Sequence, residues 1–434
     1  MTYTVDRRPL EIPAFRRLWA ASVVGAVGGS FSVVAVPTQL FTMTGSSATV
    51  GAAAAVSFGA LAVASLWGGA LADMVDRRRL LLAAHGGLAL TYLALWAQTA
   101  WGGRSVPVLL ALVACQGLTF GAIMVTMGAA VPRVVPTDLL TAANSLSSLV
   151  RYGGSIVGPL LAGVLIPVAG LGTLYLFDAV ALLAVLWAVA KLPPIPPKPR
   201  PATTSTGQRP PVLGRPATAP GDRRPSTFGH VLAGFRYLLT SRVLVAVLAV
   251  DLAAMVFGMP IALLPELAER TYGGPAGGGV ELGLLYAAYP AGVFAAGLMS
   301  GTFTRARRHG ALMASAAAVW GGTVVVLGLA PHLWLALAAL TLGGAVNFVL
   351  STFRNAISQA YTDDALRGRI QGSLTVVLQG GPQLAHLLHG AAASAFGPQL
   401  TICAGGLLTV TTVTAIVRLS PHLWHYTADD AHGR

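Results

Sequence analysis

The chain is a succession of long apolar runs separated by short polar turns. Residues 50–71 and residues 80–103 carry no charged side chain, and a turn with two aspartates and three arginines separates these two runs. A run of this length, coiled as a helix, crosses the roughly 30 Å hydrocarbon core of a bilayer. The same pattern continues along the chain and predicts twelve spanning helices, near 15–41, 49–72, 80–102, 106–131, 142–167, 171–191, 243–265, 280–303, 311–330, 333–354, 370–396 and 398–419.

Composition supports this prediction and argues against a soluble enzyme. The 434 residues are 55% hydrophobic and only 10% charged, with a mean hydropathy of +0.70, whereas soluble domains carry about 25% charged residues. Cys115 and Cys403 both lie in apolar runs, where a cysteine behaves as a small hydrophobe. We expect an all-α integral membrane protein with twelve transmembrane helices in two pseudo-symmetric six-helix bundles, and no enzymatic activity.

The distribution of positive charge fixes the expected topology. A net charge of +13 would suggest a nucleic-acid partner in a soluble protein. With the N-terminus inside, all but three of the 28 Lys and Arg residues fall on cytoplasmic segments, the exceptions being Arg104, Arg151 and Arg270. This asymmetry is what the positive-inside rule requires. We therefore expect both termini in the cytoplasm, the lipid bilayer as the partner of the charged surface, and no nucleic acid.

A stretch rich in proline and arginine divides the chain. We expect an N-terminal bundle at 1–191, a linker ending in an amphipathic surface helix at 192–242, a C-terminal bundle at 243–419 and a cytoplasmic tail at 420–434. The two bundles echo each other, since Asp138-Leu139-Leu140 and Asp364-Ala365-Leu366 stand at corresponding positions before helices 5 and 11. Two related halves joined by a linker are typical of secondary transporters.

The turn between helices 2 and 3 can form a cluster of ion pairs. Its candidate residues are Gly69, Asp73, Asp76, Arg77 and Arg78. The pattern Gly-x3-Asp-x3-Arg-Arg resembles the corresponding loop of the major facilitator superfamily, although Met74 and Asp76 replace the basic residue and the glycine usual there. In that superfamily the loop latches the two halves in one access state, which implies a gating role here. The alternative is an ordinary positive-inside loop.

Helix 5 carries small residues at steps of four and five positions, which favour close helix packing and a kink. They are Gly154, Gly158, Pro159 and Gly163. The segment is similar to the helix-5 signature of proton-coupled antiporters in the same superfamily, with Ala162 in place of one glycine. Plain helix packing explains the pattern almost as well, and the resemblance adds the expectation of export.

Two charges lie inside the predicted helices, Arg151 in helix 5 and Asp251 in helix 7. An ionisable residue within a membrane is costly and is a functional candidate by default. Arg151 keeps its charge, whereas Asp251 can gain and lose a proton, so the two suit substrate attraction and proton coupling in a central cavity. The alternative is a structural role for one or both.

Weaker candidates are polar residues scattered over helices 1, 6 and 11, namely Gln39, Asp178, Gln379 and His386. His386 and His389 could share a helix face, but a third metal ligand is missing nearby, so we expect neither a metal nor another cofactor. A Walker-type glycine loop is also missing, so the energy source is expected to be an ion gradient or the gradient of the substrate.

Longer motifs resemble the siderophore-exporter branch of the superfamily, in order over nearly the whole chain. Among them are Phe15-Arg16-Arg17-Leu18-Trp19, Val150-Arg151-x-Gly153, Gly283-Leu284-Leu285-Tyr286-Ala287-Ala288 and Gly368-Arg369-Ile370-x-Gly372. The resemblance implies an exporter of the bacterial inner membrane that moves a siderophore-like small molecule outward in exchange for protons. We expect it to act as a monomer.

Two other functions stay open. Drug or macrolide efflux is the first, because the same branch contains such proteins. A sensor or assembly factor without transport is a more distant alternative. Such a protein should carry a folded domain outside the bilayer, and the longest polar segment here is the linker.

Overall fold

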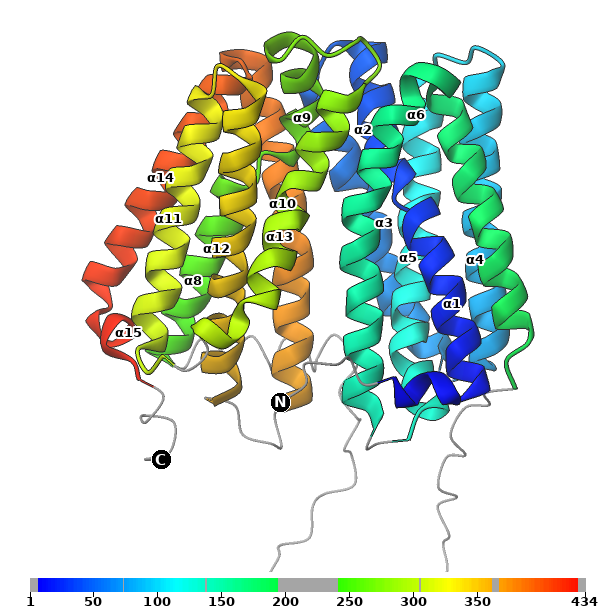
Figure 1. Ribbon diagram of the computed structural model, residues 1–434, viewed down its shortest axis with the longest axis horizontal. Helices are drawn as coiled ribbons and strands as arrows, with labels where there is room; N and C mark the ends of the chain where they lie inside the picture. The colour runs from blue at the N-terminus through cyan, green and yellow to red at the C-terminus, as the bar shows by residue number, and fades with distance from the viewer. Residues whose placement is uncertain are drawn as a thin grey trace, which may run out of the picture.

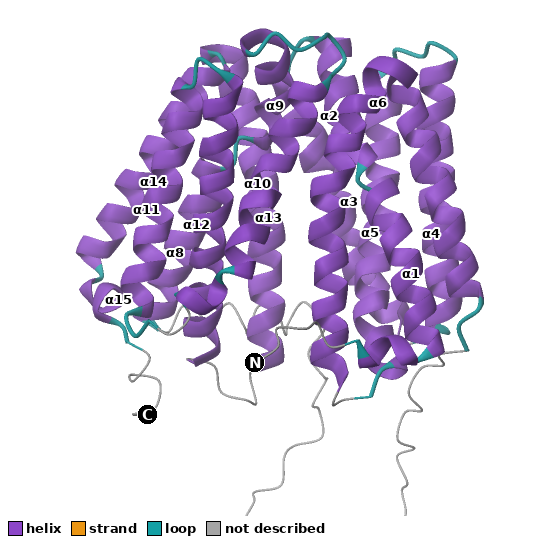
Figure 2. Cartoon of the chain, viewed as in Figure 1, coloured by secondary structure: helices purple, strands orange, loops and turns teal. Residues whose placement is uncertain are grey.

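The computed structural model describes residues 7–72, 74–136, 139–193, 241–303, 306–360 and 367–427. Within these ranges all regular secondary structure is helical (Figures 1 and 2). The predicted linker lies almost wholly outside them. The expected all-helical membrane fold is confirmed, since a helix lies on every predicted span. Ten described helices, which take in all of these spans except 370–396, are long and apolar enough to cross a membrane.

The described part of the N-terminal half contains a short 3-10 helix and six long helices. They are η1 (Arg8–Glu11), α1 (Pro13–Gly28), α2 (Phe31–Thr44), α3 (Ser47–Ala72), α4 (Arg77–Ala100), α5 (Val106–Val134) and α6 (Leu140–Ala190). With 51 residues, α6 comprises two crossings, because the chain turns at Gly170, whose φ is 79° and ψ 161°. Glycine adopts this positive φ without a steric penalty, and the turn falls between the predicted helices 142–167 and 171–191.

The C-terminal half alternates long helices with short irregular ones. They are α8 (Arg242–Gly258), η3 (Ile261–Leu263), α9 (Leu264–Glu266), η4 (Leu267–Thr271), α10 (Val280–Leu298), η5 (Ser300–Thr302), α11 (His309–Leu329), α12 (Leu333–Ala360), α13 (Arg367–Phe396), α14 (Pro398–Leu419) and α15 (Pro421–His425). The predicted helix at 333–354 ends too early, because α12 continues to Ala360.

Two of the predicted spans are broken rather than continuous. The span 15–41 is interrupted between α1 and α2, and the span 243–265 is interrupted after α8 at Met259 and Pro260. Gly28, Gly29 and Ser30 at the first break are weak helix formers, and Pro260 at the second has no N–H for a helical hydrogen bond. The breaks therefore lie at corresponding places, in the first helix of each half.

The two halves lie side by side, with α1–α6 on one side and α8–α15 on the other (Figure 1). The start of α1 and the end of α14 lie at the same end of the molecule, at the bottom of Figure 1. Near the opposite end α6 and α10 touch through glycines, so that a Cβ added to Gly163 would lie 2.9 Å from the Cα of Gly283. Gly51 of α3 likewise meets the carbonyl oxygen of His386 in α13. These close approaches hold the halves together at that end.

Candidate functional site

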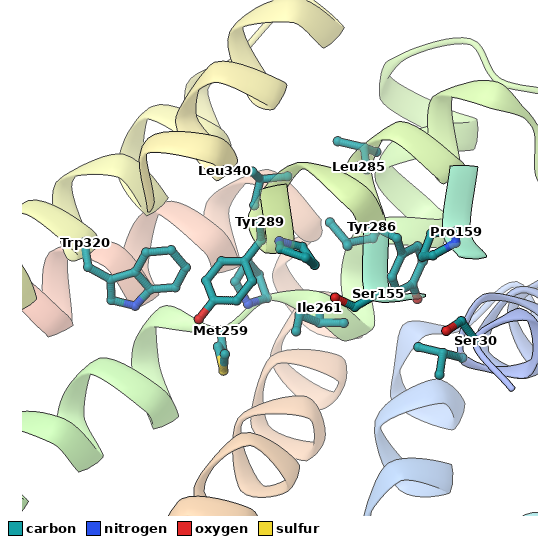
Figure 3. Close-up of a pocket in the computed structure, with 14 residues that line it drawn as sticks. Ser30, Ser155, Pro159, Met259, Ile261, Leu285, Tyr286, Tyr289, Trp320 and Leu340 are labelled. Atoms are coloured by element: carbon teal, nitrogen blue, oxygen red, sulfur yellow. The ribbon is translucent and has the colours of Figure 1, made fainter. Parts of the chain in front are cut away.

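Two cavities lie between the halves, next to the two helix breaks. The larger has a volume of about 480 Å³ and the smaller about 190 Å³. Val33, Ile261 and Tyr286 line both, so the cavities adjoin. The smaller one is shown in Figure 3, where Ser30, Ser155 and Pro159 of the N-terminal half face Tyr289 and Trp320 of the C-terminal half.

The larger cavity presents amides, an imidazole and aromatic rings. Gln379, Gln383 and His386 of α13 line it, together with Gln116 of α5 and several apolar residues. Its described lining contains no Asp, Glu, Lys or Arg side chain. The Nε2 atom of His386 is buried and has no hydrogen-bond partner among the described residues. The structure thus brings two of the weaker sequence candidates, Gln379 and His386, to one cavity wall.

Asp178 lies behind the wall of this cavity, at the break in helix 1. Its carboxylate accepts a hydrogen bond of 2.8 Å from the backbone N–H of Ser32, near the start of α2, and the side chain is fully buried. The Ser32 hydroxyl donates in turn to the hydroxyl of Tyr92 at 3.1 Å, and both residues line the larger cavity. Asp178 therefore fixes the backbone of the break rather than facing the cavity directly.

Gln39 has an internal role in the N-terminal half. Its amide oxygen accepts the Tyr175 hydroxyl at 2.7 Å, and its amide nitrogen donates to the Thr99 hydroxyl at 3.2 Å. The side chain is buried and is not among the residues that line either cavity. Gln39 thus joins α2 to α4 and α6.

The partner of Asp251 is Arg354 of α12. One guanidinium nitrogen donates to both carboxylate oxygens, at 2.9 Å and 3.0 Å, and the exposed fractions of the side chains are 2% for Asp251 and 10% for Arg354. Sequence reasoning missed this partner because the predicted helix ended at Arg354 and left it on a cytoplasmic segment. A helical pattern extended to Ala360 would have placed it inside the membrane.

Arg151 lies elsewhere. It is exposed, and its guanidinium carbon lies 5.3 Å from the centre of the neighbouring Tyr152 ring. The structure does not pair Arg151 with Asp251, and neither residue is among those lining the two cavities. Their coupling roles stay predictions.

The candidate gating loop is described only in part, because Asp73 lies outside the described residues. Gly69 is in the last turn of α3, and Asp76 caps α4 by accepting the backbone N–H of Arg78 at 2.8 Å. The Arg78 guanidinium donates to the carbonyl oxygen of Ala190 at 2.5 Å, at the end of α6, and Arg77 is buried. The gating role of the loop stays a prediction.

The small residues of helix 5 lie at contacts with both halves. Gly154 packs against Ala26 of α1, within the N-terminal half. Gly163 packs against Gly283 of α10, across the interface, and Pro159 lines the smaller cavity. Gly158 is buried between them. The segment is therefore a packing element at the interface of the halves, which is compatible with either sequence interpretation.

A polar cluster that the sequence analysis did not single out joins the halves at the end opposite the start of α1. Glu266 of α9 is buried and accepts hydrogen bonds from the Ser47 hydroxyl at 2.5 Å and from Arg270 at 2.6 Å. Arg270 also donates to the carbonyl oxygen of Gly45 at 3.2 Å and lies over the Phe41 ring. This Glu266 cluster links the turn between α2 and α3 to the end of helix 7.

Metal ligation finds no support in the described part of the chain, where no three His, Cys, Asp or Glu side chains gather closely enough to hold an ion. The Nδ1 atom of His389 lies 3.1 Å from the carbonyl oxygen of Met259. The site is thus built from hydrogen-bonding and aromatic groups around two cavities.

A helical membrane protein with two packed halves, paired helix breaks and cavities between them is built as a small-molecule transporter. The sequence profile described as Major Facilitator Superfamily matches residues 18–386. The chain therefore belongs to this superfamily and is a multi-pass membrane transporter.

Relatives and solved structures agree with this assignment. The enterobactin exporter EntS of Shigella boydii is 28% identical over 396 residues, covering 91% of this chain and 88% of the relative. EntS of Escherichia coli gives the same figures. The crystal structure of the nucleoside transporter NupG has a TM-score of 0.68 at 12% identity, covering 94% of this chain and 98% of the other. A bacterial homologue of the iron transporter ferroportin, solved in an inward-facing state, has 0.67 at 14% identity, covering 94% and 98%. At such identities the two structures show the fold alone.

Proposed function

We propose that the chain exports a siderophore-like small molecule. The observation that carries the proposal is the adjoining pair of cavities at the helix breaks, in a chain that resembles enterobactin exporters over 91% of its length. The larger cavity offers amide and imidazole hydrogen bonds among aromatic rings, which suits a polar molecule with aromatic or carbonyl groups. The cavities would open alternately to one side of the membrane and then to the other, and this alternating access would carry the molecule across the membrane.

Proton exchange is the proposed energy source. The Asp251–Arg354 pair supplies a carboxylate that can change protonation state, and Arg151 supplies a fixed positive charge. One charge that crosses the full membrane potential is worth about 2.3 kcal/mol per 100 mV, enough for roughly a fifty-fold substrate gradient. Asp178 and His386 are the next candidates for this role.

The expected location is the bacterial inner membrane, with both termini in the cytoplasm and the protein acting as a monomer. Cysteines introduced at Ser46 and Thr206 would test the orientation. The residue at position 46 should react with an impermeant thiol reagent from outside, and that at 206 only after permeabilisation. The reverse pattern would invert the proposed topology.

The function is tested by comparing secreted metabolites of a strain lacking the gene with those of its complemented counterpart. Loss of siderophore from the medium, with its accumulation in the cells, supports the proposal. Proteoliposomes with an imposed pH gradient and enterobactin as the probe then test transport directly. Unchanged siderophore secretion together with increased sensitivity to macrolides would instead favour drug efflux.

A further inference from the structure

The break in helix 1 gives α2 an N-terminus inside the N-terminal half, where Phe31 and Ser32 are buried. The first N–H groups of a helix have no partner within that helix and need acceptors from elsewhere. Ser30, which precedes α2, does not supply one, because its hydroxyl donates back to the carbonyl oxygen of Ala26 in α1. The start of α2 therefore depends on a group from another helix.

That group is the carboxylate of Asp178, from the second crossing of α6. Its Oδ2 atom accepts the Ser32 N–H at 2.8 Å, and its Oδ1 atom is buried without a hydrogen-bond partner among the described residues. The N-terminal end of a helix carries a partial positive charge that stabilises a nearby anion. Ionised Asp178 is thus suited to hold the start of α2 in place.

Among the described residues, no cation offsets the charge of Asp178. Tyr92 of α4 and Tyr175 of α6 are the titratable groups near it, and a tyrosine is uncharged at neutral pH. No described Lys, Arg, His or Glu side chain of the helices around it acts on it. A fully buried carboxylate without a cation is costly. Its charge therefore depends on the Ser32 N–H and on the end of α2.

Two hydroxyl groups connect this carboxylate to the larger cavity. The Ser32 hydroxyl lies within hydrogen-bonding reach of Asp178 and donates to the Tyr92 hydroxyl at 3.1 Å. The Gln116 amide also donates to the Tyr92 hydroxyl, at 3.5 Å, and Ser32, Tyr92 and Gln116 all line the cavity. A proton can therefore pass between the cavity and Asp178 along the two hydroxyls, although the carboxylate itself does not face the cavity.

We propose that Asp178 is a proton-binding site that controls the break in helix 1. The ionised carboxylate holds the start of α2 through the Ser32 N–H. Binding of a proton weakens this hydrogen bond and removes the attraction between the carboxylate and the end of α2, so that α2 and its part of the cavity wall can shift. The population of the shifted form should rise by up to about 30-fold. This inference rests on the proposed proton-driven export and gives the N-terminal half its own proton-sensitive element.

Fluorine NMR of the purified protein in lipid nanodiscs tests this role. A trifluoromethyl probe is attached to a cysteine at Val33, which belongs to α2 and lines both cavities, after Cys115 and Cys403 have been replaced by alanine. Its resonance reports the position of α2 between about pH 4 and 9, the range in which buried carboxyl groups titrate. We expect a proton-binding step in this protein. Asp178→Asn, which cannot ionise, should keep the resonance at its low-pH position at every pH.

A pair of tyrosine variants tests the assignment even if Asp178→Asn does not fold. Tyr92→Phe frees the Ser32 hydroxyl to donate to the ionised carboxylate, so the midpoint of the step should fall by about one pH unit. Tyr175→Phe is the matched control and should leave the midpoint unchanged, because this hydroxyl donates to Gln39 instead. A resonance that does not change with pH, a step that persists in Asp178→Asn, or equal midpoints in the two tyrosine variants overturns the proposal.

Export assays separate this proposal from the proposed function. If Asp178→Asn abolishes the proton-binding step but cells with the unaltered protein export no siderophore, the export function fails and the proton-binding site stands. If cells export enterobactin and the step persists in Asp178→Asn, the proton-binding site fails and the export function stands.

Discussion

Replacing either member of the Asp251–Arg354 pair is expected to destabilise the protein strongly, and to different extents. Both carboxylate oxygens accept from one guanidinium nitrogen, and the side chains are 2% and 10% exposed. Breaking a buried pair by removing one partner costs about 3–5 kcal/mol. Asp251→Asn leaves a guanidinium that cannot lose its proton, whereas Arg354→Met leaves a carboxyl group that can become neutral by binding one.

We therefore expect Asp251→Asn to cost about 5 kcal/mol and Arg354→Met about 3 kcal/mol in unfolding free energy. The double variant should cost less than the sum, because it leaves no unpaired charge. Denaturant unfolding of the detergent-solubilised protein measures all three. Additive costs, or single costs below about 1 kcal/mol as in exposed pairs, would refute the reasoning.

The same variants test coupling in proteoliposomes with an imposed pH gradient. Asp251→Asn removes the only group of the pair that can exchange a proton, so it should still exchange substrate across the membrane but lose its response to the gradient. This assay requires folded Asp251→Asn protein, and the unfolding measurements identify the conditions under which that variant stays folded. A wild-type response to the gradient would exclude Asp251 as the coupling residue and turn attention to Asp178 and His386.

Three further variants test other parts of the molecule. If the loop latches the halves, Asp73→Asn should reduce the amount of secreted siderophore while the amount of protein in the membrane stays normal. Near-normal export would instead indicate that the loop only sets the membrane topology. Arg151→Ala should reduce export by several-fold or more, because a fixed charge is lost, and a wild-type rate in proteoliposomes would contradict this. Glu266→Ala removes the acceptor shared by the Glu266 cluster. The distribution of distances between spin labels at Ser46 and Ala276 should therefore broaden towards longer values. An unchanged distribution would show that the glycine contacts alone close this end.

The hydrophobic pattern was sufficient to predict the helices but not the contacts between their polar residues. Helix positions follow from apolar runs, a property of each segment alone, and so the spans agree closely with the structure. The pairing of Asp251 with Arg354 depends on how two helices far apart in sequence pack. A helix end placed at residue 354 instead of Ala360 was enough to hide it. Tyr286 and Tyr289 gave no signal, because aromatic residues in apolar helices are common.

The helix breaks are the feature of the sequence that could have located the site. In transporters built from two related halves, interrupted hydrophobic segments at corresponding positions point to the binding site. Gly28-Gly29-Ser30 interrupts the first helix of one half, and Met259-Pro260 interrupts the first helix of the other.

At each break, a side chain from the same half contacts the backbone. Residues next to each break line both cavities. Asp178 accepts the N–H of Ser32 after the first break, and His389 contacts the carbonyl oxygen of Met259 at the second. Protonation of Asp178 would weaken the hydrogen bond that its carboxylate accepts from the Ser32 N–H, whereas His389 can donate from Nδ1 to the Met259 carbonyl oxygen in either protonation state. If proton exchange drives transport as proposed, protonation of Asp178 would therefore act directly on the backbone of the first break, which lines the cavities.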